Sequence, residues 1–194
     1  MKLPLFPLFI LLMSCQLNST SAHKTKDYSD KIEKIKTFVK HTKYNKNTAF
    51  MIDYSLHSGL NRFFVVDLKT DAIIKKGLVC HGSCKGDNDS KYAKVFSNKN
   101  DSYCTSLGFA LVEERAYSKW GKNYKYWLKG LEKTNDNMRN RVVVLHAWEG
   151  VPDDAIYPKN IATSFGCPTV SVKFLDHLDG ILKIEKKILL YSFD

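Results

Sequence analysis

Short runs of β-branched and aromatic residues, separated by turn residues, narrow the possible folds of this chain more than any other pattern in it. Such runs favour β-strands, and Ser58-Gly59 and Thr70-Asp71 are typical turn residues between the first three. The expected strands are residues 49–54, 62–68, 72–80, 105–114, 139–148 and 186–193. Because the first three follow closely on one another, they predict a β-meander. We expect a mainly β fold, a sandwich or barrel with a few short helices.

Two helices are predicted, one at each end of the strand-rich region. Ser29 or Asp30 can cap the first helix, and Glu33, three residues after Asp30, can complete a capping box with it. Its apolar face is expected to comprise Ile32, Ile35, Phe38 and Val39. Apolar spacing over residues 172–178 predicts a second, short helix that stops at Gly180.

The first residues are typical of an exported protein. Lys2 precedes an apolar run, residues 3–13, that is too short to span a bilayer. Residues 12–15 resemble a bacterial lipobox, which would make Cys15 the lipidated N-terminus; an ordinary signal peptide with an incidental cysteine is the alternative. Two or three acyl chains, at about 0.8 kcal/mol per buried CH₂, would hold the protein on a membrane.

The remaining chain divides into a polar segment and one folded region. Residues 1–15 are expected to be a lipoprotein signal peptide, residues 16–27 a flexible tether and residues 28–194 a single domain. After this first run, the sequence contains no apolar stretch long enough to span a membrane.

The chain is basic, with 30 Lys and Arg against 20 Asp and Glu and a formal net charge of +10. Nucleic acid is not an expected partner, because the lysines are scattered and an exported protein seldom meets it. Two interpretations stay open: an ordinary solvated surface, or attraction to an anionic polymer of the cell envelope. The sequence does not predict an oligomeric state.

The segment Ser-Phe-Gly-Cys-Pro, residues 164–168, contains the strongest candidate for a catalytic residue. Cysteine is a good nucleophile only as a thiolate, so Cys167 needs a base or a positive field. His146, which ends an apolar run and precedes Ser164 by seventeen intervening residues, is the candidate base. Gly166 would let the backbone approach a substrate closely. The N–H groups around Gly166 and Cys167, beside Phe165, could then stabilise an oxyanion.

A histidine, a gap of this size and Ser-x-Gly-Cys together resemble the catalytic signature of the L,D-transpeptidases, the YkuD-type peptidoglycan enzymes. The resemblance extends to "FSN" at 96–98, "SLGF" at 106–109, residues 128–148 and "SFGCPTVS" at 164–171. It runs from about Gly77 to the end of the chain. It implies an L,D-transpeptidase-like catalytic domain over residues 28–194, located in the cell envelope.

The resemblance also implies a mechanism. Cys167 would attack the carbonyl of a murein stem peptide after the L-centre of diaminopimelate, and His146 would take the thiol proton and later protonate the leaving amine. An amine of a second stem peptide would resolve the acyl-enzyme into a cross-link, without any cofactor. With water as acceptor the same site would be an L,D-carboxypeptidase. A non-catalytic peptidoglycan-binding lipoprotein is a further alternative. A papain-like peptidase is disfavoured because its cysteine precedes its histidine.

Two other residues fit the family pattern less directly. His81, in a His-Gly pair that the family carries near its active site, is interpreted as contacting substrate or supporting residues that do. Arg141 lies five residues before His146, so a regular strand would put the two on opposite faces. A salt-bridged structural role for Arg141 is therefore favoured over a place in the cleft. Ala147-Trp148 stand where relatives often have Gly directly after the histidine.

Three further cysteines remain in the domain: Cys80, Cys84 and Cys104. A zinc site from Cys80, His81 and Cys84 is disfavoured because neighbouring residues rarely bind one ion and no second pair completes a tetrahedron. No metal is therefore expected. An oxidising compartment favours a disulfide. Cys84–Cys104 is preferred, because Cys80 looks like the buried end of a strand, but the other pairings stay open.

Overall fold

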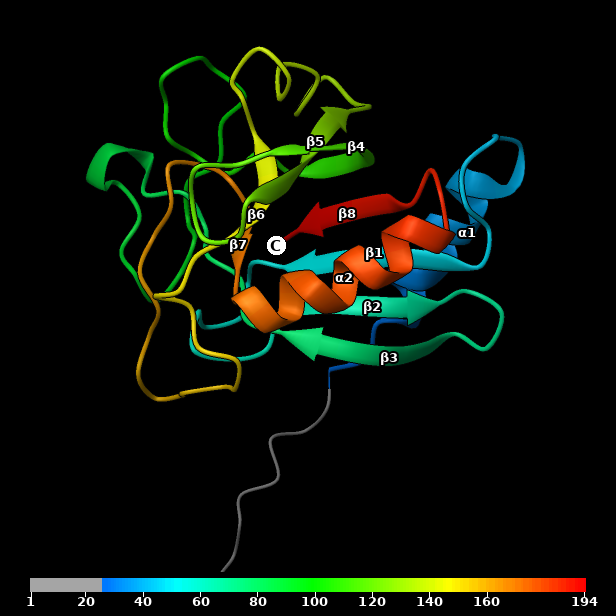
Figure 1. The fold of residues 1–194 in the computed structure, drawn as a ribbon, viewed down its shortest axis with the longest axis horizontal. Coiled ribbons are helices and arrows are strands. Elements are labelled where there is room, and N and C mark those ends of the chain that lie inside the picture. The colour runs from blue at the N-terminus through cyan, green and yellow to red at the C-terminus, as the bar shows by residue number, and fades with distance from the viewer. Residues whose placement is uncertain (1–25) are drawn as a thin grey trace, which may run out of the picture.

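The computed structural model describes residues 26–194, which form one mixed, nearly closed eight-stranded sheet with two α-helices (Figure 1). The mainly β prediction is therefore confirmed. The predicted signal peptide, Cys15 and residues 16–25 of the predicted tether lie outside the described residues. The elements are α1 (Ser29–Lys40), β1 (Thr48–Asp53), β2 (Phe63–Asp67), β3 (Ala72–Gly77), β4 (Gly108–Tyr117), β5 (Tyr124–Gly130), β6 (Val144–Ala147), β7 (Thr169–Val170), α2 (Val172–Ile184) and β8 (Leu189–Phe193), with a 3₁₀ turn at Cys84–Gly86.

The sheet has the strand order β3-β2-β1-β8-β4-β5-β6-β7. The first three strands form the predicted antiparallel meander. The last strand of the chain, β8, enters the middle of the sheet, parallel to β1 and antiparallel to β4. At the far edge β6 pairs antiparallel with β5 and parallel with the two-residue β7. This edge brings His146 and Thr169 into register.

The two helices cover opposite faces of the sheet. On one face α1 buries Ile32, Ile35 and Val39 against Met51 and Phe64. On the other face α2 packs its buried leucines against a second apolar cluster of the sheet. Because β1 is covered on both faces, all six of its residues are buried.

The helix ends differ from the prediction. The α1 helix begins at Ser29, and the backbone N–H of Ser29 donates to the Asp27 carboxylate at 2.9 Å, so neither predicted capping residue acts as the cap. The α2 helix runs through Gly180 to Ile184. A glycine inside a helix costs about 1 kcal/mol, and apolar packing around α2 outweighs that cost.

A third difference from the prediction concerns the strand expected at residues 139–148, of which only Val144–Ala147 form a strand. Residues just before it form a turn, and Val142 has a positive φ of 57°. The strand β5 was not predicted, although its buried residues, Tyr124, Tyr126 and Leu128, alternate with less buried ones as in a half-buried strand.

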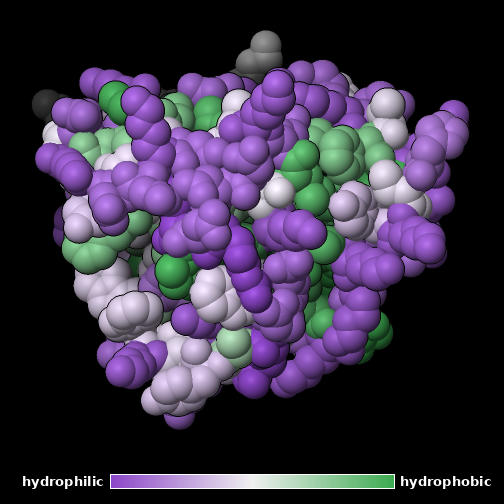
Figure 2. Space-filling model, turned by 90° about the horizontal axis from the view of Figure 1, so that it is seen from above, coloured by the Kyte–Doolittle hydropathy of each residue, from purple (hydrophilic) through white to green (hydrophobic). Residues whose placement is uncertain are grey.

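Hydrophilic residues cover most of the face seen in Figure 2, with small apolar areas between them. Within residues 26–194, neither helix has the length and apolar character needed to cross a membrane.

Candidate active site

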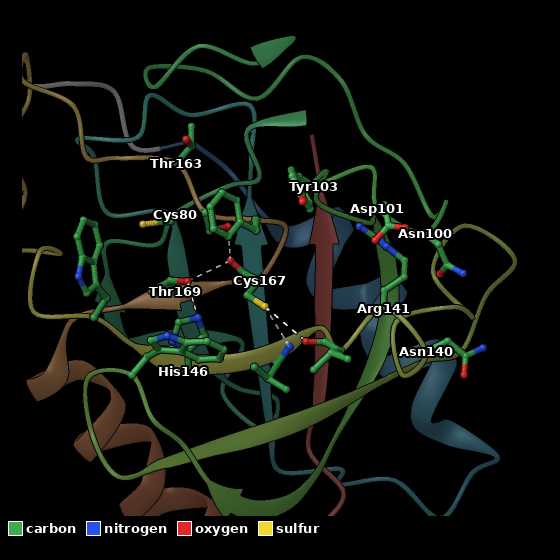
Figure 3. Close-up of a pocket in the computed structure, with 16 residues that line it drawn as sticks. Cys80, Asn100, Asp101, Tyr103, Asn140, Arg141, His146, Thr163, Cys167 and Thr169 are labelled. Atoms are coloured by element: carbon green, nitrogen blue, oxygen red, sulfur yellow. Dashed lines mark hydrogen bonds between the residues drawn. The ribbon is translucent and has the colours of Figure 1, made fainter. Parts of the chain in front are cut away.

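A cavity of about 650 Å³ opens at the β6–β7 edge of the sheet, and both Cys167 and His146 line it. Figure 3 shows Cys167 between two groups of side chains: His146 and Thr169 lie on one side, and Arg141 lies on the other with Asn100 and Asp101. Exposed aromatic residues form much of its rim. They are Tyr103, Trp120, Trp148 and Phe165.

Cys167 is partly exposed, unpaired and held in a tight loop just before β7. Its sulfur lies 3.5 Å from the backbone nitrogen of Val144 and 3.8 Å from the carbonyl oxygen of Val142. Burial raises the pKa of the Cys167 thiol, whereas the Val144 N–H, Arg141 and Lys125 act in the opposite direction. The thiol is therefore mainly protonated at neutral pH in the unliganded protein.

Ser164 fixes the shape of this loop. Its hydroxyl donates to the carbonyl oxygen of Cys167 at 2.7 Å and accepts from the N–H of Gly166 at 3.1 Å. Its backbone N–H donates to the carbonyl of His81 at 2.7 Å. Ser164 thus joins the Cys167 loop to the segment that contains His81.

Gly166 is required by packing within the protein. Its φ is +107°, and a Cβ at this position would lie 2.7 Å from the carbonyl oxygen of Cys104. The close approach is therefore to the chain's own backbone, whereas the sequence suggested an approach to substrate. Because the N–H of Gly166 is taken by Ser164, it is not free for an oxyanion. In the described residues, the N–H of Cys167 donates to no protein acceptor and remains available.

His146 lies on β6, in register with Thr169 on β7 and Lys125 on β5. Its Nδ1 is 3.1 Å from the carbonyl oxygen of Ala147, and its Nε2 is 3.0 Å from the Thr169 hydroxyl. A carbonyl only accepts, so Nδ1 carries the proton of the neutral ring and Nε2 accepts from Thr169. Burial lowers the pKa of His146 below its ordinary value.

The same contacts can also hold the protonated imidazole. The Thr169 oxygen lies 3.3 Å from the Cys167 carbonyl oxygen, so the hydroxyl can turn to donate there and accept from Nε2–H. Within residues 26–194 no hydrogen bond joins the Cys167 sulfur to either ring nitrogen of His146. Catalytic hydrogen bonds are often long before substrate binds. The two side chains share the cavity, as the spacing in the sequence predicted.

Arg141 differs from its prediction in two ways. It lines the cavity, because it lies in a turn and the alternation of a regular strand does not apply to it. It also forms no ion pair among the described residues. Its guanidinium donates to neutral oxygens of Ser97, Ser102, Cys104 and Ser106.

His81 does not line the cavity and is fully buried, so it cannot contact a substrate held there. Its Nδ1 lies 2.7 Å from Nη2 of the buried Arg62, and its Nε2 lies 2.8 Å from the carbonyl oxygen of Asp89. It supports the loop of Cys167 through its own carbonyl, which accepts from Ser164.

Phe165 lies at the mouth of the cavity. The residue is 78% exposed, and its ring centroid is 5.1 Å from that of Tyr103. Thr169 was not recognised in the sequence, although a strand that begins beside Cys167 places residues two apart on one face. Trp120, whose ring centroid is 6.0 Å from that of His146, is contributed by the β4–β5 connection, and no sequence pattern indicates that contact.

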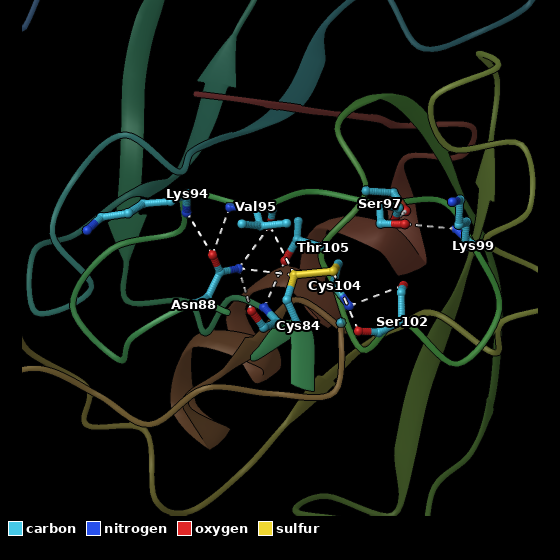
Figure 4. The surroundings of a disulfide bond; sticks show 12 residues. Cys84, Asn88, Lys94, Val95, Ser97, Lys99, Ser102, Cys104 and Thr105 are labelled. Atoms are coloured by element: carbon cyan, nitrogen blue, oxygen red, sulfur yellow. Dashed lines mark hydrogen bonds between the residues drawn. A yellow bond between two sulfur atoms is a disulfide. The ribbon is translucent and has the colours of Figure 1, made fainter. Parts of the chain in front are cut away.

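The disulfide Cys84–Cys104 is present, as preferred from the sequence (Figure 4). It joins the 3₁₀ turn to the segment of residues 97–106, which contains all four partners of Arg141. Cys80 is unpaired and buried. The described residues contain no cluster of three or more His, Cys, Asp or Glu side chains suited to a metal ion.

A family model described as the L,D-transpeptidase catalytic domain matches residues 19–193. No curated protein sequence gave a match. The helical cell shape determining protein Pgp2 of Campylobacter jejuni is a similar solved structure, 10% identical with a TM-score of 0.47, covering 78% of this chain and 49% of that one.

A second similar structure is the L,D-transpeptidase of Xylanimonas cellulosilytica, which is 11% identical with a TM-score of 0.44, covering 78% of this chain and 62% of that one. A third, the Ldtfm–avibactam carbamoyl enzyme, is 14% identical with a TM-score of 0.45, covering 77% and 50%. The chain thus spans between about half and three-fifths of the length of these structures.

Proposed function

This chain belongs to the L,D-transpeptidase catalytic-domain family, and on that premise we propose that it is a cell-envelope peptidoglycan L,D-transpeptidase. Its substrate would be the murein stem peptide, and the reaction would pass through an acyl-enzyme on Cys167. The observation that carries the proposal is a free, partly exposed Cys167 in one cavity with His146, next to an available backbone N–H.

In the first half-reaction, the Cys167 sulfur attacks the carbonyl carbon of the bond between the L-centre of diaminopimelate and the following D-residue. The thiol proton passes to His146, whose contacts with Ala147 and Thr169 suit the protonated ring. The Cys167 N–H faces the developing oxyanion. Collapse of the tetrahedral intermediate breaks the peptide bond, and the imidazolium gives its proton to the departing amine. The acyl group then remains on Cys167 as a thioester.

In the second half-reaction, an amine of another stem peptide attacks the thioester carbonyl. Its proton passes to His146, the bond to sulfur breaks and the proton returns to the thiolate. A cross-link between two stem peptides results. The two half-reactions require no cofactor, because neither is a redox step and the thioester keeps the acyl group activated for the second amine.

We also propose that the protein is a lipoprotein, held at a membrane by acyl chains on Cys15 with the polar residues after it as a tether. The apolar run before Cys15 and the lipobox-like residues support this. The test is fractionation of cells that express wild type or Cys15→Ala. Release of the variant into the soluble fraction is expected, whereas retention in the membrane would show that another anchor holds the protein.

The proposed activity is tested by incubating the full-length protein in detergent with sacculi rich in tetrapeptide stems and analysing the muropeptides by mass spectrometry. New cross-links between two diaminopimelate residues, with release of the terminal D-residue, are expected. Cys167→Ser and His146→Gln are expected to reduce product by at least about a hundredfold. His41→Gln, a substitution in an exposed residue after α1, is the matched control.

Each other result has a defined meaning. Release of the D-residue without cross-links would make the protein an L,D-carboxypeptidase. Binding to sacculi without any product would favour the non-catalytic lipoprotein. Full activity in a correctly folded Cys167→Ser protein would remove the proposed nucleophile.

A further inference from the structure

We infer that Arg141 is a positioning residue for the nucleophile, and that its unpaired positive charge stabilises the Cys167 thiolate. The catalytic part of this inference rests on the proposed function. The effect of Arg141 on the ionisation and reactivity of the Cys167 thiol does not rest on it, and this effect can be measured without any substrate.

The first observation is where the guanidinium lies. Arg141 lines the same cavity as Cys167, on the side opposite His146 (Figure 3). A Cβ built on Gly166 would be 3.3 Å from Arg141 Nη2, so the cation packs directly on the residue before the nucleophile. A positive group at this position is one of the arrangements that turn a thiol into a reactive thiolate.

The second observation is that the charge of Arg141 is not neutralised. Nη1 donates to the carbonyl of Ser97 at 2.9 Å and to the Ser106 hydroxyl, and Nη2 donates to the carbonyl of Cys104 at 2.7 Å and to the Ser102 hydroxyl at 3.2 Å. All four acceptors are neutral. Asp101 also lines the cavity, but it forms no ion pair with Arg141.

An unpaired, half-buried cation is costly, because burial removes water without an opposite charge in exchange. Burial accordingly lowers the pKa of Arg141. By contrast, the nearby Arg139 forms ion pairs with Glu113 and Glu114 at 3.0 and 2.7 Å. A neutral side chain could also donate hydrogen bonds to neutral oxygens, at a lower cost. The positive charge of Arg141 therefore needs a separate explanation.

Binding of a substrate carboxylate is a weaker explanation. Recognition of a carboxylate by arginine usually uses two parallel N–H groups. Here the Nη1 and Nη2 groups already donate to the segment of residues 97–106. The guanidinium is therefore held in place by the protein, and its paired N–H groups are not available to bind a carboxylate.

His146 does not supply this charge in the unliganded protein. Its ring nitrogens contact Ala147 and Thr169, and its pKa is lowered, so it is neutral at pH 7. Lys125 on β5 is the other nearby cation, and its ammonium group lies 4.9 Å from the centroid of the Trp127 ring. Among residues 26–194, the titratable or charged groups that line the cavity with Cys167 or interact with it electrostatically are Arg141, Lys125, His146, Tyr54, Cys80, Asp101 and Tyr103.

The test measures alkylation of Cys167 in the full-length protein as a function of pH, with peptide mass spectrometry to separate it from the other cysteines. In Arg141→Gln, alkylation by iodoacetamide at pH 7 is expected to be roughly tenfold slower, with the pH midpoint moved upward. Arg141→Lys is expected to restore most of the rate. Arg139→Gln, which removes an ion-paired arginine, is the matched control and is expected to behave as wild type.

A second measurement needs no variant and covers the case in which Arg141→Gln does not fold. An unpaired cation beside the sulfur attracts an anionic reagent, so the ratio of iodoacetate to iodoacetamide rates at Cys167 should exceed that of N-acetylcysteine amide and fall as salt is added. An equal ratio would overturn the inference. Equal pH midpoints for wild type and a folded Arg141→Gln protein would also overturn it, even if the sacculus assay shows activity.

Discussion

At the scale of single residues, Gly166 shows how the chain's own packing sets the shape of the catalytic loop. Gly166→Ala would place a methyl group 2.7 Å from the Cys104 carbonyl oxygen at a φ of +107°. We expect a loss of about 1–3 kcal/mol of unfolding free energy. We also expect a large loss of cross-linking, because the displaced backbone carries Cys167. Urea denaturation and the sacculus assay measure the two effects.

Gly86→Ala provides the control for this substitution. Gly86 has nearly the same φ, +106°, but no atom lies within 4 Å of a Cβ built there. The Gly86→Ala variant should therefore lose only the unfolding free energy that a positive φ costs an alanine, and it should keep its activity. Equal activity losses in the two variants would mean that the close approach to Cys104 is unimportant.

At the residue level, the structure shows where the predicted site residues lie, and their catalytic roles are part of the proposal. Cys167, His146 and Ser164 do line one cavity, as the spacing suggested. Arg141 was misplaced because the alternation rule was applied to a segment that turns before β6 begins. Of the two interpretations of His81, the supporting one agrees with its buried place behind the Cys167 loop, where its carbonyl accepts from Ser164. Nothing in the sequence shows that Arg62, nineteen residues earlier, packs against its ring.

At the scale of elements, the disulfide links the short 3₁₀ turn at Cys84–Gly86 to a segment around Cys104 that belongs to no helix or strand. Asn88 supports the same joint, since its amide donates to the carbonyls of Gly82 and Val95, both at 2.9 Å (Figure 4). Cys104 also supplies a carbonyl to Arg141. The bond therefore stabilises the side of the cavity opposite His146.

We expect the double variant Cys84→Ser/Cys104→Ser to lose about 3 kcal/mol of unfolding free energy, since the bridge closes a loop of 20 residues. Cys167 alkylation at pH 7 should also slow, because the partners of Arg141 become less fixed. Denaturant unfolding and alkylation under oxidising conditions measure this. Dithiothreitol should weaken wild type similarly and leave the double variant unchanged. A further effect on the variant would point to another target of the reductant.

Element-level prediction was accurate for strands with continuous apolar composition and failed at short or interrupted ones. The runs that became β1, β2 and β8 are buried, and each of their ends was predicted to within three residues. The two-residue β7 has no periodicity to detect, and it exists because β6 pairs with it. The α2 helix passed Gly180 because burial of Leu178 and Leu182 outweighs propensity.

At the scale of the whole molecule, a buried cation and a buried imidazole connect acid stability to the active site. Arg62 is fully buried and donates to the carbonyls of Val79 and Leu56 and to Nδ1 of His81. Because a guanidinium only donates, Nδ1 must accept, and Nε2–H then donates to the Asp89 carbonyl. The folded state thus requires His81 to be neutral.

Burial, with Arg62 as the next cause, lowers the pKa of His81 from 6.5 to about 4. The unfolded chain binds this proton near pH 6.5 and the folded chain only near pH 4. The stabilisation is therefore complete above about pH 6.5 and is lost as pH falls toward 4. The expected loss is on the order of 3 kcal/mol. His57, His146 and His177 also have lowered pKa values and add to the same slope.

Urea denaturation at a series of pH values from 7 to 4 isolates the part of the slope due to His81. His81→Gln, which cannot titrate, should show a flatter dependence on pH than wild type. Because the His81 carbonyl accepts from Ser164, the loop of Cys167 should loosen in the same range. Cross-linking should then fall along with stability in wild type. An unchanged slope in His81→Gln would show that the acid sensitivity arises elsewhere.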